Sequence, residues 1–168
     1  MNYKFREAQF SEAGQIWEIL QGAIARRLAD GSNQWQDGYP NVDNVRSDID
    51  KGAGYVMVAD DIIVGYVAIF INDEPEYAKI KGRWLTNGDF VVFHRVAIAE
   101  QFLRQGLAKK ILHFIEEFAI SKNILSVKAD TNFDNFAMMR IFDTLGYVQC
   151  GEVSFRGSSR IAYEKVLR

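Results

Sequence analysis

A strand–helix–strand succession in the second half of the chain constrains the fold most. Residues 90–99 are rich in β-branched and aromatic side chains and predict a strand, as do residues 125–129. Between them, residues 105–122 carry a helical apolar face made of Leu107, Ile111, Phe114, Ile115 and Phe118. Because parallel neighbouring strands need a crossover of this kind, the segment predicts a sheet with at least one parallel pair.

The first fifty residues predict a strand and two helices. Residues 2–8 indicate a short strand, and Ser11 is an N-cap candidate for an amphipathic helix that ends at Asp30-Gly31. After a loop rich in polar and aromatic residues, a shorter helix is indicated by the helical spacing of Val42, Val45 and Ile49.

The remaining segments complete the sheet. Residues 55–59 and 62–71 are β-rich and predict a hairpin, and residues 72–89 form a polar, acidic insertion. A helix at 135–145 ends at Gly146 and precedes β segments at 147–155 and 161–167. No linker or repeat interrupts the chain. We therefore expect one domain over residues 1–168, of the α/β (α+β) class, with a mixed sheet of about six to seven strands flanked by four helices.

Composition excludes several classes of protein. With 22 acidic and 20 basic residues among 168, the net charge is −2, and no Lys/Arg cluster favours nucleic-acid binding. The single Cys150 forbids an intrachain disulfide, and one Cys with two His gives no Cys-rich zinc site. The longest apolar run, 62–71, is too short for a membrane helix of about 20 residues. With no secretory signal at its start, the chain is expected to be cytoplasmic, without membrane or nucleic-acid partners.

The junction between the strand at 90–99 and the following helix is the strongest functional signal. Its sequence from Val96 to Lys110 places Gly106 and the small Ala108 where the helix opens. Unpaired backbone N–H groups and the positive end of the helix dipole converge there, which favours an anion. The glycine spacing fits neither the Walker loop nor the dinucleotide fingerprint. A glycine that serves only helix–sheet packing is the alternative.

This junction resembles the acetyl-coenzyme A motif of the GNAT superfamily of N-acetyltransferases, [Gln/Arg]-x-x-Gly-x-[Gly/Ala], at Leu103-Arg104-Gln105-Gly106-Leu107-Ala108. Asn135, Ala137 and Leu145-Gly146-Tyr147 are similar to further signatures of that family, and the order of elements agrees over nearly the whole chain. The resemblance implies the GNAT fold, acetyl-CoA as cosubstrate and no metal. It also allows a homodimer.

The resemblance assigns the cofactor contacts by position. It implies that the backbones of Val96 and Ile98 bind the pantetheine amides and that Asn135 caps a helix and reaches the same arm. The pyrophosphate would be wrapped by Leu103, Arg104, Gln105, Gly106, Leu107 and Ala108, with Lys109 nearby. The motif begins with Leu103 instead of Gln or Arg, and Arg104 could compensate for the missing charge.

Phe142 occupies the position beside the cofactor where this family often has a tyrosine that protonates the departing thiolate. A thiolate with a pKa near 8.5 leaves without much help, so catalysis could survive the change. Tyr147 and Cys150 are alternative donors, although both residue types at these places are more often core residues.

The attacking amine must lose a proton, since its pKa is near 10. His94 is the candidate base, because an alternating strand would put Phe90, Val92, His94, Val96 and Ile98 on one face and imidazole titrates near pH 6.5. Asp130, at the end of the next strand, is the rival base. A core histidine and a capping aspartate are the structural alternatives.

The acceptor site is the part that the sequence describes least. Large aromatic side chains in loops gain little unless they pack on something, and in this family such loops form the acceptor groove. The candidates are Trp35, Tyr39, Tyr77 and Trp84, with plugs over the core as the alternative. The acidic run Asp73, Glu74 and Glu76 would favour a cationic acceptor.

Two functions remain open at this point. The first is an enzyme that moves an acetyl group from acetyl-CoA to the amine of a small molecule or a protein by direct attack. The second is an acyl-CoA binding or sensing module with the same fold and no turnover, which Phe142 favours.

Overall fold

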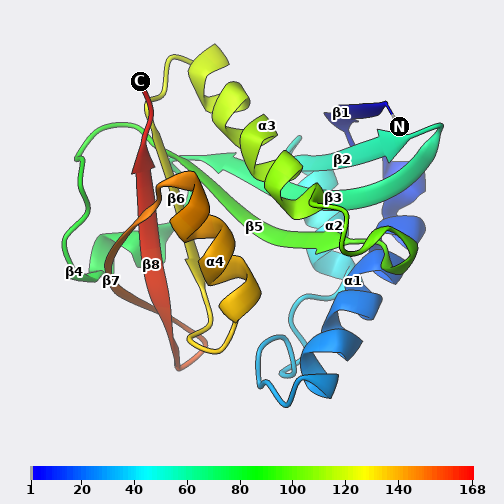
Figure 1. The fold of residues 1–168 in the computed structure, drawn as a ribbon, viewed down its shortest axis with the longest axis horizontal. Helices are drawn as coiled ribbons and strands as arrows, with labels where there is room; N and C mark the ends of the chain where they lie inside the picture. The colour runs from blue at the N-terminus through cyan, green and yellow to red at the C-terminus, as the bar shows by residue number, and fades with distance from the viewer. Residues whose placement is uncertain (1) are drawn as a thin grey trace. The chain divides into compact units, whose positions relative to one another are not determined.

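The computed structural model describes residues 2–168. Its strands form an eight-stranded mixed sheet in the order β1-β2-β3-β5-β6-β8-β7-β4 (Figure 1). The chain divides into two compact units, which are described separately below. The first unit comprises the residues up to Ile69 and His94–Phe114, and the second comprises Phe70–Phe93 and Ile115–Arg168.

The first unit combines antiparallel strands with helices on both faces. Strand β1 (Tyr3–Glu7) pairs with β2 (Gly54–Ala59), which pairs with β3 (Ile62–Ile71) through the expected hairpin. The unit also holds the second half of β5 (Val91–Ile98) and three helical segments. These are α1 (Ala13–Ala29), α2 (Val42–Asp50) and the first half of α3 (Leu107–Ser121).

Each face of these strands buries a different set of side chains. On one face, Val56 and Tyr66 belong to a cluster with Ile16 and Leu20 of α1 and Val45 of α2. On the other face, the ring of Phe5 stacks on that of Phe114 in α3, with centroids 4.3 Å apart. In Figure 1, α3 accordingly crosses in front of β2 and β3 while α2 lies behind them.

Close approach of α3 to β3 depends on Gly65. A Cβ at this position would lie 3.1 Å from the Cδ1 atoms of both Ile111 and Ile98. The glycine therefore permits the tight packing of the helix that follows the strand–helix junction.

The second unit contains the parallel pair. The start of β5 runs parallel to β6 (Ser126–Thr131), with Val91 opposite Val127. Strand β6 pairs antiparallel with β8 (Ser158–Val166), and β8 pairs with β7 (Val148–Phe155). Helix α4 (Phe136–Leu145) ends at Gly146, whose φ of 86° is the left-handed conformation expected of a glycine C-cap.

The strand count is higher than the sequence predicts because of β4 (Lys81–Gly82), which lies within the polar insertion and pairs with β7. The insertion also holds a 3₁₀ turn, η2 (Pro75–Lys79). A Cβ on Gly82 would lie 2.1 Å from the Cys150 carbonyl oxygen, so β4 depends on close backbone contact. A strand of two residues is too short to show an alternation of apolar and polar side chains, so the sequence did not predict it.

The start of the first helix also differs from the prediction, because Ser11 is not its N-cap. A 3₁₀ turn, η1 (Phe10–Glu12), precedes α1 and is held by a capping box between Gln9 and Glu12. The Glu12 carboxylate accepts from Arg6 at 2.7 Å and from the Gln9 backbone N–H at 2.8 Å. These bonds stabilise the 3₁₀ turn η1 directly before α1 begins.

The expected uninterrupted alternation from Phe90 to Ile98 does not hold. Arg95 has a φ of 61°, a left-handed conformation that is typical of a bulge and interrupts the period of two. Its side chain instead reaches Asp48 of α2, as described below.

Among residues 2–168, no helix is long and apolar enough to cross a membrane.

Candidate active site

The β5–α3 junction has the backbone conformation of an anion cradle. A short 3₁₀ turn, η3 (Glu100–Phe102), leads into a loop in which Arg104 and Gly106 both have positive φ, 64° and 72°. Leu107 is buried and anchors the start of α3, while the Lys110 N–H bonds to the Gly106 carbonyl at 3.2 Å. The N–H groups of Leu107, Ala108 and Lys109 precede the first intrahelical bond and are available to a ligand.

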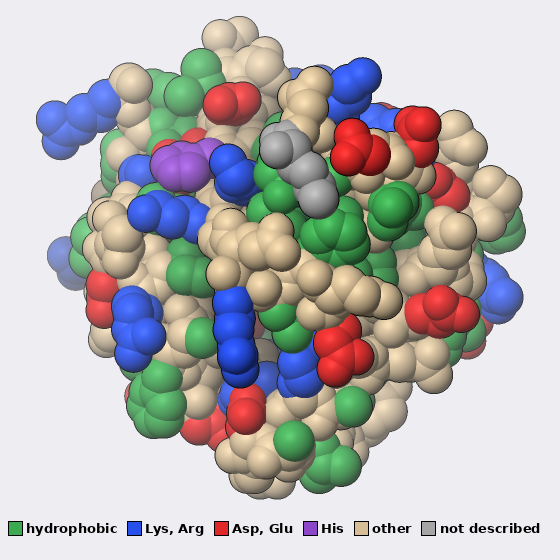
Figure 2. Space-filling model, turned by 45° about the vertical axis from the view of Figure 1, so that its right-hand side comes forward, with side chains coloured by type: hydrophobic (Ala, Val, Ile, Leu, Met, Phe, Trp, Pro, Cys, Tyr) green, Lys and Arg blue, Asp and Glu red, His purple; other side chains and the backbone are tan. Residues whose placement is uncertain are grey.

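Space and charge at this loop also suit an anion. A Cβ added to Gly106 would meet no atom within 4 Å, so the backbone is open on that side. Arg104, Gln105, Lys109 and Lys110 are exposed. On the face of the molecule in Figure 2, Lys and Arg side chains gather beside a histidine.

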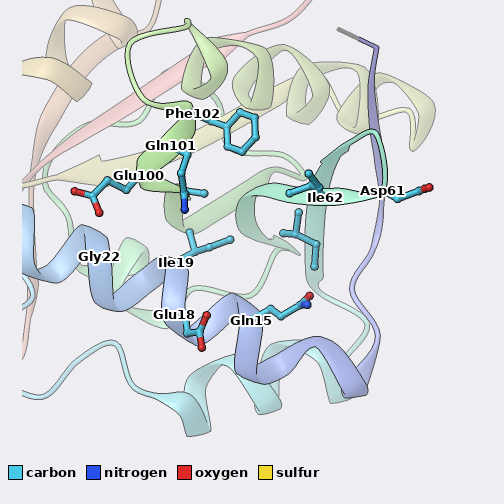
Figure 3. A pocket seen from close by; sticks show the side chains of 11 residues that line it. Gln15, Glu18, Ile19, Gly22, Asp61, Ile62, Glu100, Gln101 and Phe102 are labelled. Atoms are coloured by element: carbon cyan, nitrogen blue, oxygen red, sulfur yellow. The ribbon is translucent and has the colours of Figure 1, made fainter.

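A second opening in the first unit flanks the same loop but has the opposite charge character. It has a volume of about 630 Å³ and lies between α1, the β2–β3 turn and η3. Figure 3 shows Ile19 and Gln101 pointing toward each other across it. Its lining includes Glu18, Asp61 and Glu100. Because these carboxylates repel phosphate, an anionic group is favoured at the first turn of α3 and not in this opening.

The backbone of β5 is partly engaged before any ligand binds. Val96 is half-buried, and the Ile98 carbonyl accepts from Nη2 of Arg26 at 3.0 Å. The next residue, Ala99, donates its N–H to the Val64 carbonyl at 2.9 Å. A carbonyl oxygen has two lone pairs, so a pantetheine amide at Ile98 would share the oxygen with Arg26.

In the second unit, Asn135 performs the capping role that the resemblance implies. Its side chain accepts from the Met138 N–H at 3.2 Å and begins α4. Phe142, on the same helix, is 1% exposed, and its ring centroid lies 4.4 Å from that of Tyr163 and 5.0 Å from that of Tyr147. Phe142 therefore brings a packed aromatic ring and no proton to its position.

The two alternative proton donors are also buried. Burial raises the pKa of the Tyr147 hydroxyl and of the Cys150 thiol. Both groups therefore hold their protons more firmly than an exposed tyrosine or cysteine.

The two candidate bases lie in different surroundings. His94 is half-buried in β5, and its Nε2 is buried. Asp130 is half-buried in β6, where its Oδ2 accepts from the Tyr77 hydroxyl at 2.6 Å. Burial, with the Asp130 charge and hydrogen bond as further causes, raises the pKa of Tyr77, so this hydroxyl stays protonated and keeps its bond to Asp130.

The four aromatic acceptor candidates fall into two pairs, one in each unit. In the first unit, Trp35 packs partly buried against the α1–α2 cluster, and the Tyr39 hydroxyl accepts from Nη1 of Arg95. In the second unit, Trp84 donates from Nε1 to the Tyr77 carbonyl at 2.8 Å, and their ring centroids are 5.0 Å apart. Packing against the core therefore explains the positions of the Trp35 and Tyr77 rings, whereas the Tyr39 side chain is held by a hydrogen bond from Arg95.

Sequence reasoning missed four charged residues that are buried in these units. They are Asp48, Lys128, Arg160 and Glu164. Asp48 pairs with Arg95, whose Nη2 lies 2.6 Å from Oδ1. The alternation Ser126, Lys128, Asp130 within an apolar strand was a readable signal that one face of β6 carries polar groups.

Comparison with known proteins agrees with the fold and the motif. Residues 20–147 match the profile of the Acetyltransferase (GNAT) family. Among curated proteins no match is found. A GNAT-family acetyltransferase structure from Streptococcus agalactiae 2603 is 34% identical, with a TM-score of 0.90 over 99% of this chain and 96% of the other.

More distant structures share the fold. A GNAT-family acetyltransferase from Listeria monocytogenes 4b F2365 is 18% identical, with a TM-score of 0.80 over 98% of this chain and 95% of that one. A Salmonella typhimurium structure that holds its cofactor acetyl-CoA is 16% identical, with a TM-score of 0.71 over 100% of this chain and 95% of its own. On the family profile and the 34% identical relative together, this chain belongs to the GNAT family of acetyltransferases.

Proposed function

We propose that the protein transfers an acetyl group from acetyl-CoA to a primary amine by direct attack, without a covalent enzyme intermediate. The observation that carries this proposal is the open, basic β5–α3 junction with positive φ at Arg104 and Gly106. Acetyl-CoA supplies an activated thioester. Backbone N–H groups from Leu103 to Ala108, with Lys109, would hold its pyrophosphate, and Val96, Ile98 and Asn135 would hold the pantetheine arm.

Amine activation is assigned to His94. A protonated amine with a pKa near 10 must lose a proton before it attacks, and a neutral imidazole can accept that proton near pH 7. Asp130 is the weaker candidate because one lone pair of its Oδ2 is already taken by the Tyr77 hydroxyl. At the other end of the reaction, Phe142 provides no acid, so the departing thiolate takes its proton from solvent.

The acceptor is proposed to be cationic. Asp73, Glu74 and Glu76 lie on the insertion, where Glu76 forms an ion pair with Lys79 at 3.4 Å. Such a local negative field raises the concentration of a protonated amine near the protein. Tyr39 and Trp35 of the α1–α2 loop, with Tyr77 and Trp84, are the proposed acceptor-groove residues.

Thiol release from acetyl-CoA across an amine panel tests the proposal. The panel contains spermidine, an aminoglycoside, an amino-acid amide, and peptides with a free N-terminus or a lysine. Amine-dependent thiol release, together with a product heavier by one acetyl group, supports the transferase. A coenzyme A-induced rise in melting temperature with no turnover on any amine would instead favour an acyl-CoA sensing module.

His94→Gln is expected to lower kcat/KM by about 100-fold, since a general base contributes about 10²–10⁴-fold. The dependence of the wild-type rate on pH should also change in the variant, because the proposed base is removed. Steady-state kinetics between pH 5.5 and 9 measure both effects, with the melting temperature of the variant as a check of folding.

Asp130→Asn is the matched comparison, because it keeps the shape of the side chain and removes its charge. We expect it to change the rate less than His94→Gln does. A His94→Gln enzyme with full activity and an unchanged pH profile would move the role of base to Asp130 or to water.

A further inference from the structure

A buried lysine on β6 is unexplained by acetyl transfer. Lys128 is only 4% exposed, and its Nζ lies 4.5 Å from the ring centroid of Trp84 and 4.2 Å from that of Phe90. Ring faces attract an ammonium group but provide no oxygen that accepts its three N–H donors. The two rings therefore provide no hydrogen-bond acceptor for the N–H groups of Lys128.

The neighbouring carboxylate does not supply the missing partner. Glu164 lies directly opposite Lys128 in the β6–β8 register and is 0% exposed. Its oxygens accept from Leu85 N–H at 2.7 Å, Ser126 Oγ at 2.6 Å and the Thr86 hydroxyl. Within the described residues 2–168, Nζ of Lys128 makes no salt bridge, and no oxygen accepts a hydrogen bond from it. An ammonium group without such a partner has N–H donors available for an oxygen of a ligand.

Lys128 also lines a cavity of about 400 Å³ in the second unit. That volume falls within the range of about 300–1,000 Å³ typical of small-molecule sites. The apolar lining includes Pro75, Tyr77, Trp84 and Phe90, and the polar lining includes the exposed Asp73 and the half-buried Glu74. The cavity thus combines aromatic surface and one inner cation with acidic groups.

We propose that this cavity binds a small aryl-bearing monocarboxylate, with the carboxylate on Lys128 and the aryl group against the aromatic lining. A charge-assisted hydrogen bond to the ammonium would supply the oxygen partner that the chain leaves out. The carboxylates of Asp73 and Glu74 oppose dianions such as phosphate esters more strongly than they oppose a monocarboxylate. The site goes beyond acetyl transfer, and it shares Tyr77, Trp84, Asp73 and Glu74 with the residues proposed to attract and bind the acceptor.

Calorimetric titration with 3-phenylpropionate tests the assignment on the full-length protein. We expect saturable binding of this probe. Two other compounds should bind at least tenfold more weakly: 3-phenylpropanol, which has no negative charge, and phenylphosphonate, which has a larger negative charge than a carboxylate. Burial lowers the pKa of Lys128. Because the bound form needs the ammonium, affinity should fall with rising pH, and it should do so at a lower pH than that at which an ordinary lysine loses its proton.

Lys128→Met should weaken binding of 3-phenylpropionate at least tenfold and leave the melting temperature unchanged or higher, because the methionine removes a desolvated charge. Lys128→Arg should restore binding in part. Lys79→Met, at an exposed lysine of the same insertion, is the control and should bind as wild type does. If Lys128→Met does not fold, the comparison of the three probes on the wild-type protein still tests whether the cavity binds a monocarboxylate.

The assignment is overturned if 3-phenylpropionate fails to bind up to 10 mM, if 3-phenylpropanol binds equally well, or if folded Lys128→Met binds with wild-type affinity. Coenzyme A binding is measured on the same samples. If none of the samples binds coenzyme A, the result counts against the proposed transferase. The titration with 3-phenylpropionate then still tests the assignment of this cavity.

Discussion

Replacing Gly106 by valine is expected to lower the affinity for coenzyme A by about 100-fold or more. A valine Cβ would enter the open space beside the first turn of α3, where the pyrophosphate is proposed to lie. The loss of two charge-assisted hydrogen bonds, at about 1.5 kcal/mol or more each, already accounts for a change of that size. Calorimetric titration of wild type and variant with coenzyme A measures the effect.

Gly31→Val provides a matched control for backbone strain. Gly31 follows α1, has a φ of 80°, and a Cβ there would also meet no atom within 4 Å. Both variants should lose about 1–2 kcal/mol of stability from the left-handed conformation. Only Gly106→Val should lose coenzyme A, and equal affinity of the two variants would remove the pyrophosphate from this loop.

Asp48→Ala is expected to lower the free energy of unfolding by about 3–5 kcal/mol, the cost of leaving a buried charge without its partner. Asp48 is 2% exposed and accepts two bonds from Arg95, at 2.9 Å and 2.6 Å, and one from the Tyr66 hydroxyl at 2.7 Å. Its removal would leave the Arg95 guanidinium largely desolvated. Urea denaturation followed by circular dichroism measures the change.

A double variant separates the lost charge pair from the lost packing. Arg95→Met combined with Asp48→Ala should be more stable than Asp48→Ala alone, since no unpaired charge then remains buried. The double variant should also disturb Tyr39, whose hydroxyl accepts from Arg95. A loss below about 1 kcal/mol for Asp48→Ala would contradict the account of this ion pair.

Several parts of the fold were readable because they depend on neighbours in the chain. Helical periodicity located α1, α3 and α4 within a few residues, since an amphipathic face repeats every 3.6 residues. Gly146 marked the end of α4 and Asn135 its start, because caps are bonds between residues three or four apart. The segment Leu103–Ala108 was likewise recognisable as the junction between β5 and α3, because the glycine and the following apolar face are neighbours in the chain.

The features that escaped the sequence depend on partners far along the chain. The left-handed conformation of Arg95 accompanies a bond to Asp48, 47 residues away, and Glu164 accepts a hydrogen bond from Leu85, 79 residues away. Strand β4 exists because Gly82 and Gly151 let two backbones approach. Capping and periodicity carry no information about such pairs.

The amino-acid sequence by itself thus determined the family, through the resemblance of its motifs, and the helices and the place of the β5–α3 junction, which follow from short-range backbone geometry and side-chain period. Only the tertiary structure decided which polar groups are buried together, namely Asp48 with Arg95, Asp130 with Tyr77, and Lys128 between two aromatic rings. Burial and charge pairing are sums over residues that meet only when the chain is folded, and they set the chemistry of these groups.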